Sequence, residues 1–179
     1  MTLSRILNIC LLLLCSVPVF AADKEAPLSV SVIDRLFTAL AGSWDGRAIE
    51  TPVGPVDYAI TFHACDEAMI AGVAELSVSD HYWQFRRSGD AFRLTFLSTF
   101  NDNREPTQLA VSEIDGSTIR FYAPELALLT LSVTLAEPHV EIRVYHHLKP
   151  HVYIRLVRSD MKMTDVERAR NESKSCKKL

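Results

Sequence analysis

The sequence predicts an all-β protein, a single antiparallel up-and-down barrel of about ten strands with one short N-terminal helix. Two observations support this fold. The hydrophobic pattern has a period of two between residues 43 and 158, which is typical of strands with one buried face. Turn residues separate these segments at the short, regular intervals of an antiparallel meander. A meander of this many strands favours closure into a barrel, because closure removes the unpaired edges. A two-sheet sandwich is the alternative arrangement.

The chain begins with the features of an exported protein. Arg5 precedes an apolar stretch, residues 6–19, that is short for a membrane span, and suitable residues for signal peptidase follow up to Ala21. We therefore expect residues 1–21 to be a signal peptide and residues 22–29 to be a linker. The mature protein would be periplasmic or extracellular. The rest of the sequence has no apolar stretch of spanning length, so we expect no membrane span.

Composition limits the classes of partner. Without residues 1–21 the chain keeps 18 basic and 22 acidic side chains, a net charge of −4. A mildly acidic domain lacks the basic patch that nucleic acid requires, so we expect no nucleic-acid partner. Cys65 and Cys176 remain after cleavage. Two thiols can pair in an oxidising compartment, but the sequence leaves the pairing of these two open.

The elements can be placed in order along the chain. Ile33, Leu36, Phe37 and Leu40 recur at helical spacing, which predicts a helix over residues 30–41 at the start of the barrel domain. Strands are expected at residues 44–49, 56–64, 69–78, 81–87, 91–100, 107–114, 118–122, 128–135, 139–147 and 151–158. The barrel domain thus spans residues 30–158. The charged tail, residues 159–179, is compatible with a frayed helix or with disorder.

The last hairpin carries three histidines, His146, His147 and His151. Pairing Tyr145 with Tyr153 gathers the apolar side chains on one face, which we expect to face the barrel interior. That face would carry Val140, Ile142, Val144, Val152, Ile154 and Leu156. The same alternation sends His146 inward, and it sends His147 and His151 outward.

A short helix, a Gly-x-Trp motif and a terminal basic residue frame the predicted barrel. Gly42 and Trp44 open the first strand, and Arg158 closes the last. This arrangement resembles the lipocalin and calycin barrels. The resemblance implies that Trp44 packs beneath Arg158 and that the pair seals the closed end of the barrel. The strand alternation independently sends Arg158 inward, where a guanidinium over an indole is a favourable cation–π contact.

Within that superfamily the chain is most similar to the nitrobindin-like haem barrels and to the fatty-acid-binding-protein barrels. Residues 42–62, GSWDGRAIETPVGPVDYAITF, resemble the nitrobindin opening, and residues 151–158, HVYIRLVR, resemble its closing strand. The resemblance implies haem as a candidate cofactor, with His151 as the ligand of its iron. A bulge beside Pro150 would be needed to turn His151 from the outer face to the lumen.

Aromatic side chains on the inward face suggest a ligand cavity, because small-molecule sites are mostly apolar with a few polar groups. The candidate ligand-binding residues are Tyr58, Phe62, Trp83, Phe85 and Phe96, with His146 and Glu75 as polar groups near the mouth. We expect an exported lipocalin-like barrel that binds a small apolar molecule in its lumen. Two alternatives remain open. One is a nitrobindin-like haem protein with nitric oxide or peroxynitrite chemistry, and the other is a solid barrel of the cell envelope that binds another protein.

Catalytic and metal motifs are missing from the sequence. No Gly-x-Ser-x-Gly elbow or comparable signature frames a nucleophile, so we predict no catalytic residue and favour a protein that is not an enzyme. His147 and His151 supply only two of the three or four ligands that zinc requires. Zinc is therefore a weaker hypothesis than haem.

Overall fold

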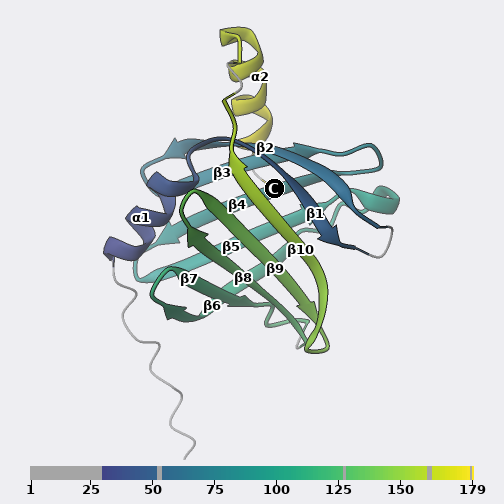
Figure 1. Ribbon diagram of the computed structural model, residues 1–179. Coiled ribbons are helices and arrows are strands. Elements are labelled where there is room, and N and C mark those ends of the chain that lie inside the picture. The colour runs from purple at the N-terminus through teal and green to yellow at the C-terminus, as the bar shows by residue number, and fades with distance from the viewer. Residues whose placement is uncertain (1–29, 52–53, 127, 161–162, 178) are drawn as a thin grey trace, which may run out of the picture.

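A computed structural model describes residues 30–51, 54–126, 128–160, 163–177 and 179. The expected signal peptide and linker lie outside the described residues. Ten antiparallel strands form a closed barrel, in which each strand pairs with its neighbours in sequence and β1 pairs with β10 (Figure 1). The strands are β1 (Gly42–Glu50), β2 (Val56–Asp66), β3 (Met69–Glu75), β4 (Asp80–Ser88), β5 (Ala91–Ser98), β6 (Thr107–Asp115), β7 (Thr118–Tyr122), β8 (Leu129–Ala136), β9 (His139–His146) and β10 (Lys149–Arg158).

This architecture confirms the predicted all-β barrel and is consistent with a calycin-like fold. The strand boundaries lie within two residues of those expected, except that β3 ends at Glu75 rather than at residue 78. A short 3-10 helix, η1 (Phe100–Asp102), follows β5. Among the described residues, no helix is both long and apolar enough to cross a membrane.

Helices lie at both ends of the domain sequence, so the expectation of a single N-terminal helix is wrong. The predicted first helix is present as α1 (Val30–Leu40), and a second helix, α2 (Asp165–Ser175), forms in the charged tail. The tail is helical because Thr164 and Glu167 form a reciprocal capping box, in which each side chain accepts a hydrogen bond from the other residue's backbone N–H. α2 packs outside the barrel, over β2, β3 and β4 (Figure 1).

α1 covers one end of the barrel, which we call the closed end. Trp44 Nε1 donates a hydrogen bond of 2.7 Å to the Leu40 carbonyl at the end of α1. The Arg158 guanidinium lies 4.3 Å from the centre of the Trp44 ring and donates to the Ala39 carbonyl at 2.6 Å and to the Ala41 carbonyl. The contact expected between Trp44 and Arg158 is therefore present, and it ties the last strand to the helix that covers this end.

Side chains fill the half of the barrel that adjoins α1. The rings of Phe62, Phe85, Phe92 and Phe121 pack against one another with centroids 5.9–6.3 Å apart, and each is at most 2% exposed. Gly72 on β3 makes this packing possible, because a Cβ there would lie 2.7 Å from Phe62 Cδ1. This half is thus a packed core.

The register of the last hairpin differs from the predicted one. Tyr153 pairs with Arg143 rather than with Tyr145, and Val144 pairs with Val152. From Val152 onward the observed and predicted registers differ by two residues, so the side chains from Val152 to Val157 keep their predicted faces. The apolar set does face the interior.

A tight turn accounts for the difference. His147 and Leu148 both have positive φ, 51° and 61°, as the two central residues of a type I′ hairpin turn do. The turn therefore lies before Lys149 and Pro150. The register then shifts between Pro150 and Val152, and His151 is the extra residue of a β-bulge.

Candidate functional site

The barrel end opposite α1 is the candidate site, and we call it the mouth. Six inward apolar side chains pack against the core here and remain half-buried. They are Val56, Leu76, Phe96, Leu129, Val144 and Val152. Small-molecule sites are lined mostly by apolar side chains with a few polar groups, so these six residues are candidates for contact with a ligand.

A chain of hydrogen bonds crosses the inner wall beside these apolar side chains. Trp83 Nε1 donates to Tyr58 Oη at 2.8 Å, and Tyr58 Oη lies 3.1 Å from His81 Nδ1. Tyr58 and Trp83 are 2% and 1% exposed, whereas His81 is half-buried near the start of β4. The chain thus runs from the packed interior to the mouth.

Small residues on β3 allow this series of hydrogen bonds to form. Tyr58 lies on β2, and His81 and Trp83 lie on β4, so their side chains must meet across the intervening strand β3. On β3 the partners of His81 and Trp83 are Ala74 and Gly72, which have little or no side chain. These small residues leave space on the inner face of β3, so that side chains of β2 and β4 can meet across it.

Burial determines the protonation states of His81 and Tyr58. Desolvation lowers the pKa of His81 to about 4, and the negative charge of Asp80 opposes this effect only in part. Burial also raises the pKa of Tyr58, and the hydrogen bond from Trp83 acts in the opposite direction. At neutral pH His81 is therefore an uncharged imidazole and Tyr58 an uncharged phenol.

Phe96 forms the aromatic wall beside the chain. Its ring centroid lies 4.5 Å from that of Trp83 and 5.4 Å from that of His81, which meets it edge-on. Tyr58 and His81 also contact each other, with centroids 5.7 Å apart. Of the predicted ligand-binding residues, Tyr58, Trp83 and Phe96 thus come together at the mouth.

The other predicted ligand-binding residues lie elsewhere. Phe62 and Phe85 belong to the packed closed half. The alternation of side chains along β9 places His146 on the inward face, but it is the last residue of that strand and is exposed on the rim. Glu75 is exposed on the outer face, where its carboxylate lies 2.6 Å from Lys174 Nζ of α2.

Sequence reasoning missed His81. The signal was present, because His81 has the same alternation as Trp83 and Phe85 and therefore points inward. Its partner Tyr58 is 23 residues away in sequence, so the hydrogen bond itself had no local signature.

The three histidines of the last hairpin form a group on the rim. His146, His147 and His151 are all exposed, with the His146 ring centroid 4.4 Å from that of His147 and 6.1 Å from that of His151. With Lys149 and Pro150 they line a surface hollow of about 500 Å³. Within the described part of the chain, no group of three or more His, Cys, Asp or Glu side chains is placed to hold a metal ion.

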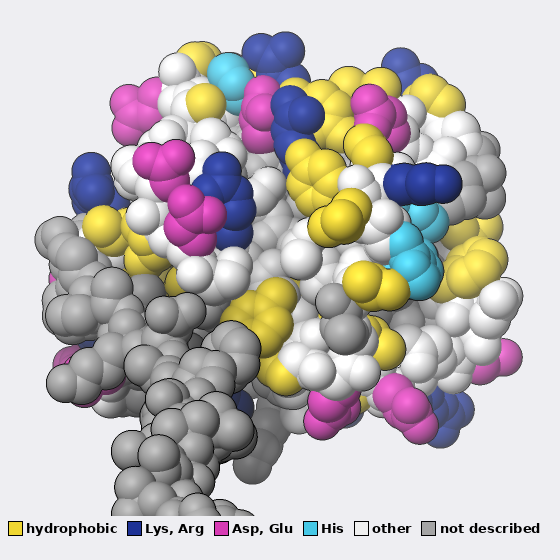
Figure 2. Space-filling view, turned by 90° about the horizontal axis from the view of Figure 1, so that it is seen from below, with side chains coloured by type: hydrophobic (Ala, Val, Ile, Leu, Met, Phe, Trp, Pro, Cys, Tyr) yellow, Lys and Arg dark blue, Asp and Glu magenta, His cyan; other side chains and the backbone are white. Residues whose placement is uncertain are grey.

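Exposed apolar side chains adjoin these histidines. Leu148 in the hairpin turn is 82% exposed, and Leu128, whose carbonyl accepts a hydrogen bond from the His147 backbone, is 44% exposed. Figure 2 shows hydrophobic side chains gathered beside a group of histidines on the face seen from below. The rim is therefore partly apolar.

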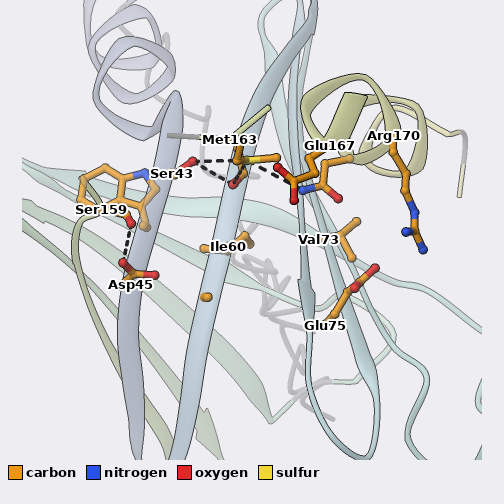
Figure 3. A pocket seen from close by; sticks show the side chains of 13 residues that line it. Ser43, Asp45, Ile60, Val73, Glu75, Ser159, Met163, Glu167 and Arg170 are labelled. Atoms are coloured by element: carbon orange, nitrogen blue, oxygen red, sulfur yellow. Dashed lines mark hydrogen bonds between the residues drawn. The ribbon is translucent and has the colours of Figure 1, made fainter. Parts of the chain in front are cut away.

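A second hollow, of about 460 Å³, lies outside the barrel between α2 and the outer face of β1, β2 and β3. Its polar groups largely satisfy one another (Figure 3). Ser43 and Thr61 hydrogen-bond at 3.0 Å, and both hydroxyls contact Met163 Sδ. Ser159 donates to the Asp45 carboxylate. These contacts hold the segment before α2 to the outer face of the barrel.

The chain matches no model of a known protein family, and no curated protein matches it. The fold and the geometry of the mouth are therefore the features that bear on function.

Proposed function

We propose that this protein is an exported lipocalin-like barrel that binds a small apolar molecule in the mouth end of its lumen. The observation that carries the proposal is the group of six half-buried apolar side chains that lie around one polar hydrogen-bond chain at the mouth. Half-buried apolar side chains also occur at the closed end, among them Phe37 and Leu135, but that end is filled by buried rings, and Phe37 packs against one of them, Phe92. An apolar ligand that covered the six side chains at the mouth would remove their surface from water, which contributes about 25 cal/mol of favourable free energy per Å² of apolar surface buried.

Export is supported by a disulfide between Cys65 of β2 and Cys176, the C-cap of α2. Disulfides persist in oxidising compartments and are rare in the cytosol. The signal-peptide features of residues 1–21 point to the same compartment.

Among calycin-like barrels we favour kinship with the apolar-ligand carriers over the nitrobindin-like haem proteins. The reason is the position of His151, which haem ligation would require in the lumen. His151 is exposed on the bulge of β10. Haem binding would thus require this hairpin to rearrange, whereas an apolar ligand requires only the mouth as it stands.

A filling substitution tests the proposal. Val152 and Val157 both lie on β10, the first half-buried at the mouth and the second 45% exposed on the outer face. The neutral dye N-phenylnaphthylamine should brighten on binding the wild-type protein. Val152→Phe should weaken that binding roughly tenfold, since overfilling a packed site costs about 1–3 kcal/mol.

Val157→Phe is the matched control, because it adds the same ring outside the barrel and should bind the dye like the wild type. Circular dichroism should show the same β-sheet signal in all three proteins. A wild-type protein that leaves the dye dark, or a Val152→Phe variant that binds it as tightly as Val157→Phe, would contradict the proposed function.

A further inference from the structure

The hydrogen-bond chain at the mouth has a fixed direction. An indole nitrogen is only a donor, so Tyr58 Oη must accept from Trp83 Nε1. The single Tyr58 hydroxyl proton is then free to donate to His81 Nδ1. If His81 Nδ1 donated to Tyr58 instead, the hydroxyl proton of Tyr58, which is 2% exposed, would be buried without a partner, so we take His81 Nδ1 as the acceptor, which carries no proton.

A neutral imidazole with an unprotonated Nδ1 carries its proton on Nε2. Burial keeps His81 neutral, because it lowers the pKa of this group to about 4. Trp83, fixed in the core, thus determines through Tyr58 which ring nitrogen of His81 is the donor.

That donor is unused and accessible. Among the described residues, the buried side-chain nitrogen and oxygen atoms that have no partner are His63 Nε2 and Ser175 Oγ. His81 Nε2 makes no hydrogen bond to the described residues either, but it is not one of these two buried atoms. Solvent therefore reaches it, next to the half-buried ring of Phe96.

We propose that His81 Nε2–H recognises the ligand, and that the ligand is an apolar molecule carrying one neutral hydrogen-bond acceptor, such as a ketone, ester or ether oxygen. The inference rests on the proposed function and specifies the chemistry of its ligand. A carboxylate is disfavoured. Neutral His81 offers it no ionic partner, the neighbouring Asp80 repels it, and its lost hydration would be costly in an apolar mouth.

Three ligands of similar shape test the proposal on the full-length mature chain. Acetylnaphthalene has a carbonyl acceptor, ethylnaphthalene has none, and naphthoate has a charged carboxylate. Each is titrated against bound N-phenylnaphthylamine, in the wild type and in His81→Asn. Asn can still accept from Tyr58 but is too short to place a donor where Nε2–H lies.

His81→Asn should weaken the binding of acetylnaphthalene roughly three- to tenfold, which corresponds to the loss of one hydrogen bond, and should leave the affinity for ethylnaphthalene unchanged. Naphthoate should bind the wild type most weakly of the three. His139→Asn, at the closed end of β9, is the control and should change none of these affinities. Equal effects of His81→Asn on the two neutral ligands would overturn the recognition role while leaving apolar binding intact. Failure of the dye and all three ligands to bind would overturn both proposals.

The protonation of His81 gives an independent test that needs no variant and no ligand. A long-range proton–nitrogen correlation spectrum at neutral pH should show a protonated Nε2 and an unprotonated Nδ1. The opposite tautomer, or a charged ring, would overturn the proposal.

Discussion

His81 shows how much the function of a single residue depends on its surroundings. Its alternation with Trp83 and Phe85 indicates only that the side chain points inward, and His146 at the end of the last hairpin has an inward alternation too. Burial beside Phe96 and the hydrogen bond from Tyr58 make it a neutral donor. The rim histidines make no comparable buried contact in the described structure.

His81 should make the folded protein sensitive to acid. Its pKa is about 4 in the folded chain and 6.5 as an unperturbed group, so the unfolded chain binds more protons between these pH values. The free energy of unfolding should therefore lose up to about 3 kcal/mol as the pH falls from 6.5 to 4, and His81 should contribute no change above that range. Urea unfolding in this window should show a smaller loss in His81→Asn than in His139→Asn. Equal acid losses in the two variants would show that His81 is not held neutral by burial.

Gly72 should be intolerant of even the smallest side chain. A methyl group at this position would lie 2.7 Å from the Phe62 ring, which is buried and packs against Phe85 with ring centroids 6.2 Å apart. Gly72→Ala should therefore lower the free energy of unfolding by about 1–3 kcal/mol, as overpacked cores do. Denaturant unfolding measures the change, and a variant as stable as the wild type would show that the closed half has unfilled space.

At the scale of elements, α2 is an accessory to a barrel that closes without it. Its side chains are mostly exposed, and it is held by the Cys65–Cys176 disulfide and by Lys174, whose Nζ lies 2.6 Å from Glu75 and 2.9 Å from Asp80. The ten strands need none of these contacts to complete their ring of hydrogen bonds.

Removing the disulfide should therefore release α2 before it disturbs the barrel. In the double variant Cys65→Ser, Cys176→Ser, amide hydrogens of α2 should exchange with solvent much faster, while those of the strands stay protected. The free energy of unfolding should fall by about 2–4 kcal/mol, because the long loop between the cysteines is no longer closed in the unfolded chain. Loss of protection in β2, β3 and β4 as well would show that α2 is part of the core structure.

The last hairpin illustrates what alternation can and cannot determine. Alternation identifies which side chains share a face, so it placed the apolar set inside correctly. It does not distinguish registers that differ by two residues. The turn at His147 and Leu148 determines the register, and this pair lacks the Asn-Gly or Asp-Gly sequence that usually marks a type I′ turn.

At the scale of the whole molecule, the fold was predictable because strand alternation and turn residues repeat along the entire barrel domain. The Trp44–Arg158 contact was predictable from a resemblance in which both residues have fixed places. α2 was left open although its Thr-x-x-Glu capping box is visible in the sequence. The disulfide and the Tyr58–His81 hydrogen bond join residues far apart in sequence, and only the folded barrel brings them together.

The central claim is that the mouth, and not the closed end, binds an apolar ligand. The protein contains two tryptophans, one near each end of the barrel. Trp83 donates a hydrogen bond to Tyr58, in the series of hydrogen bonds that leads to the mouth, and Trp44 donates one to the Leu40 carbonyl at the closed end. The most direct measurement follows both indole N–H signals in a proton–nitrogen correlation spectrum while acetylnaphthalene is added. The account predicts that the Trp83 signal shifts to saturation and that the Trp44 signal stays in place. A shift of the Trp44 signal alone, or no shift of either signal when the dye shows full occupancy, would contradict it.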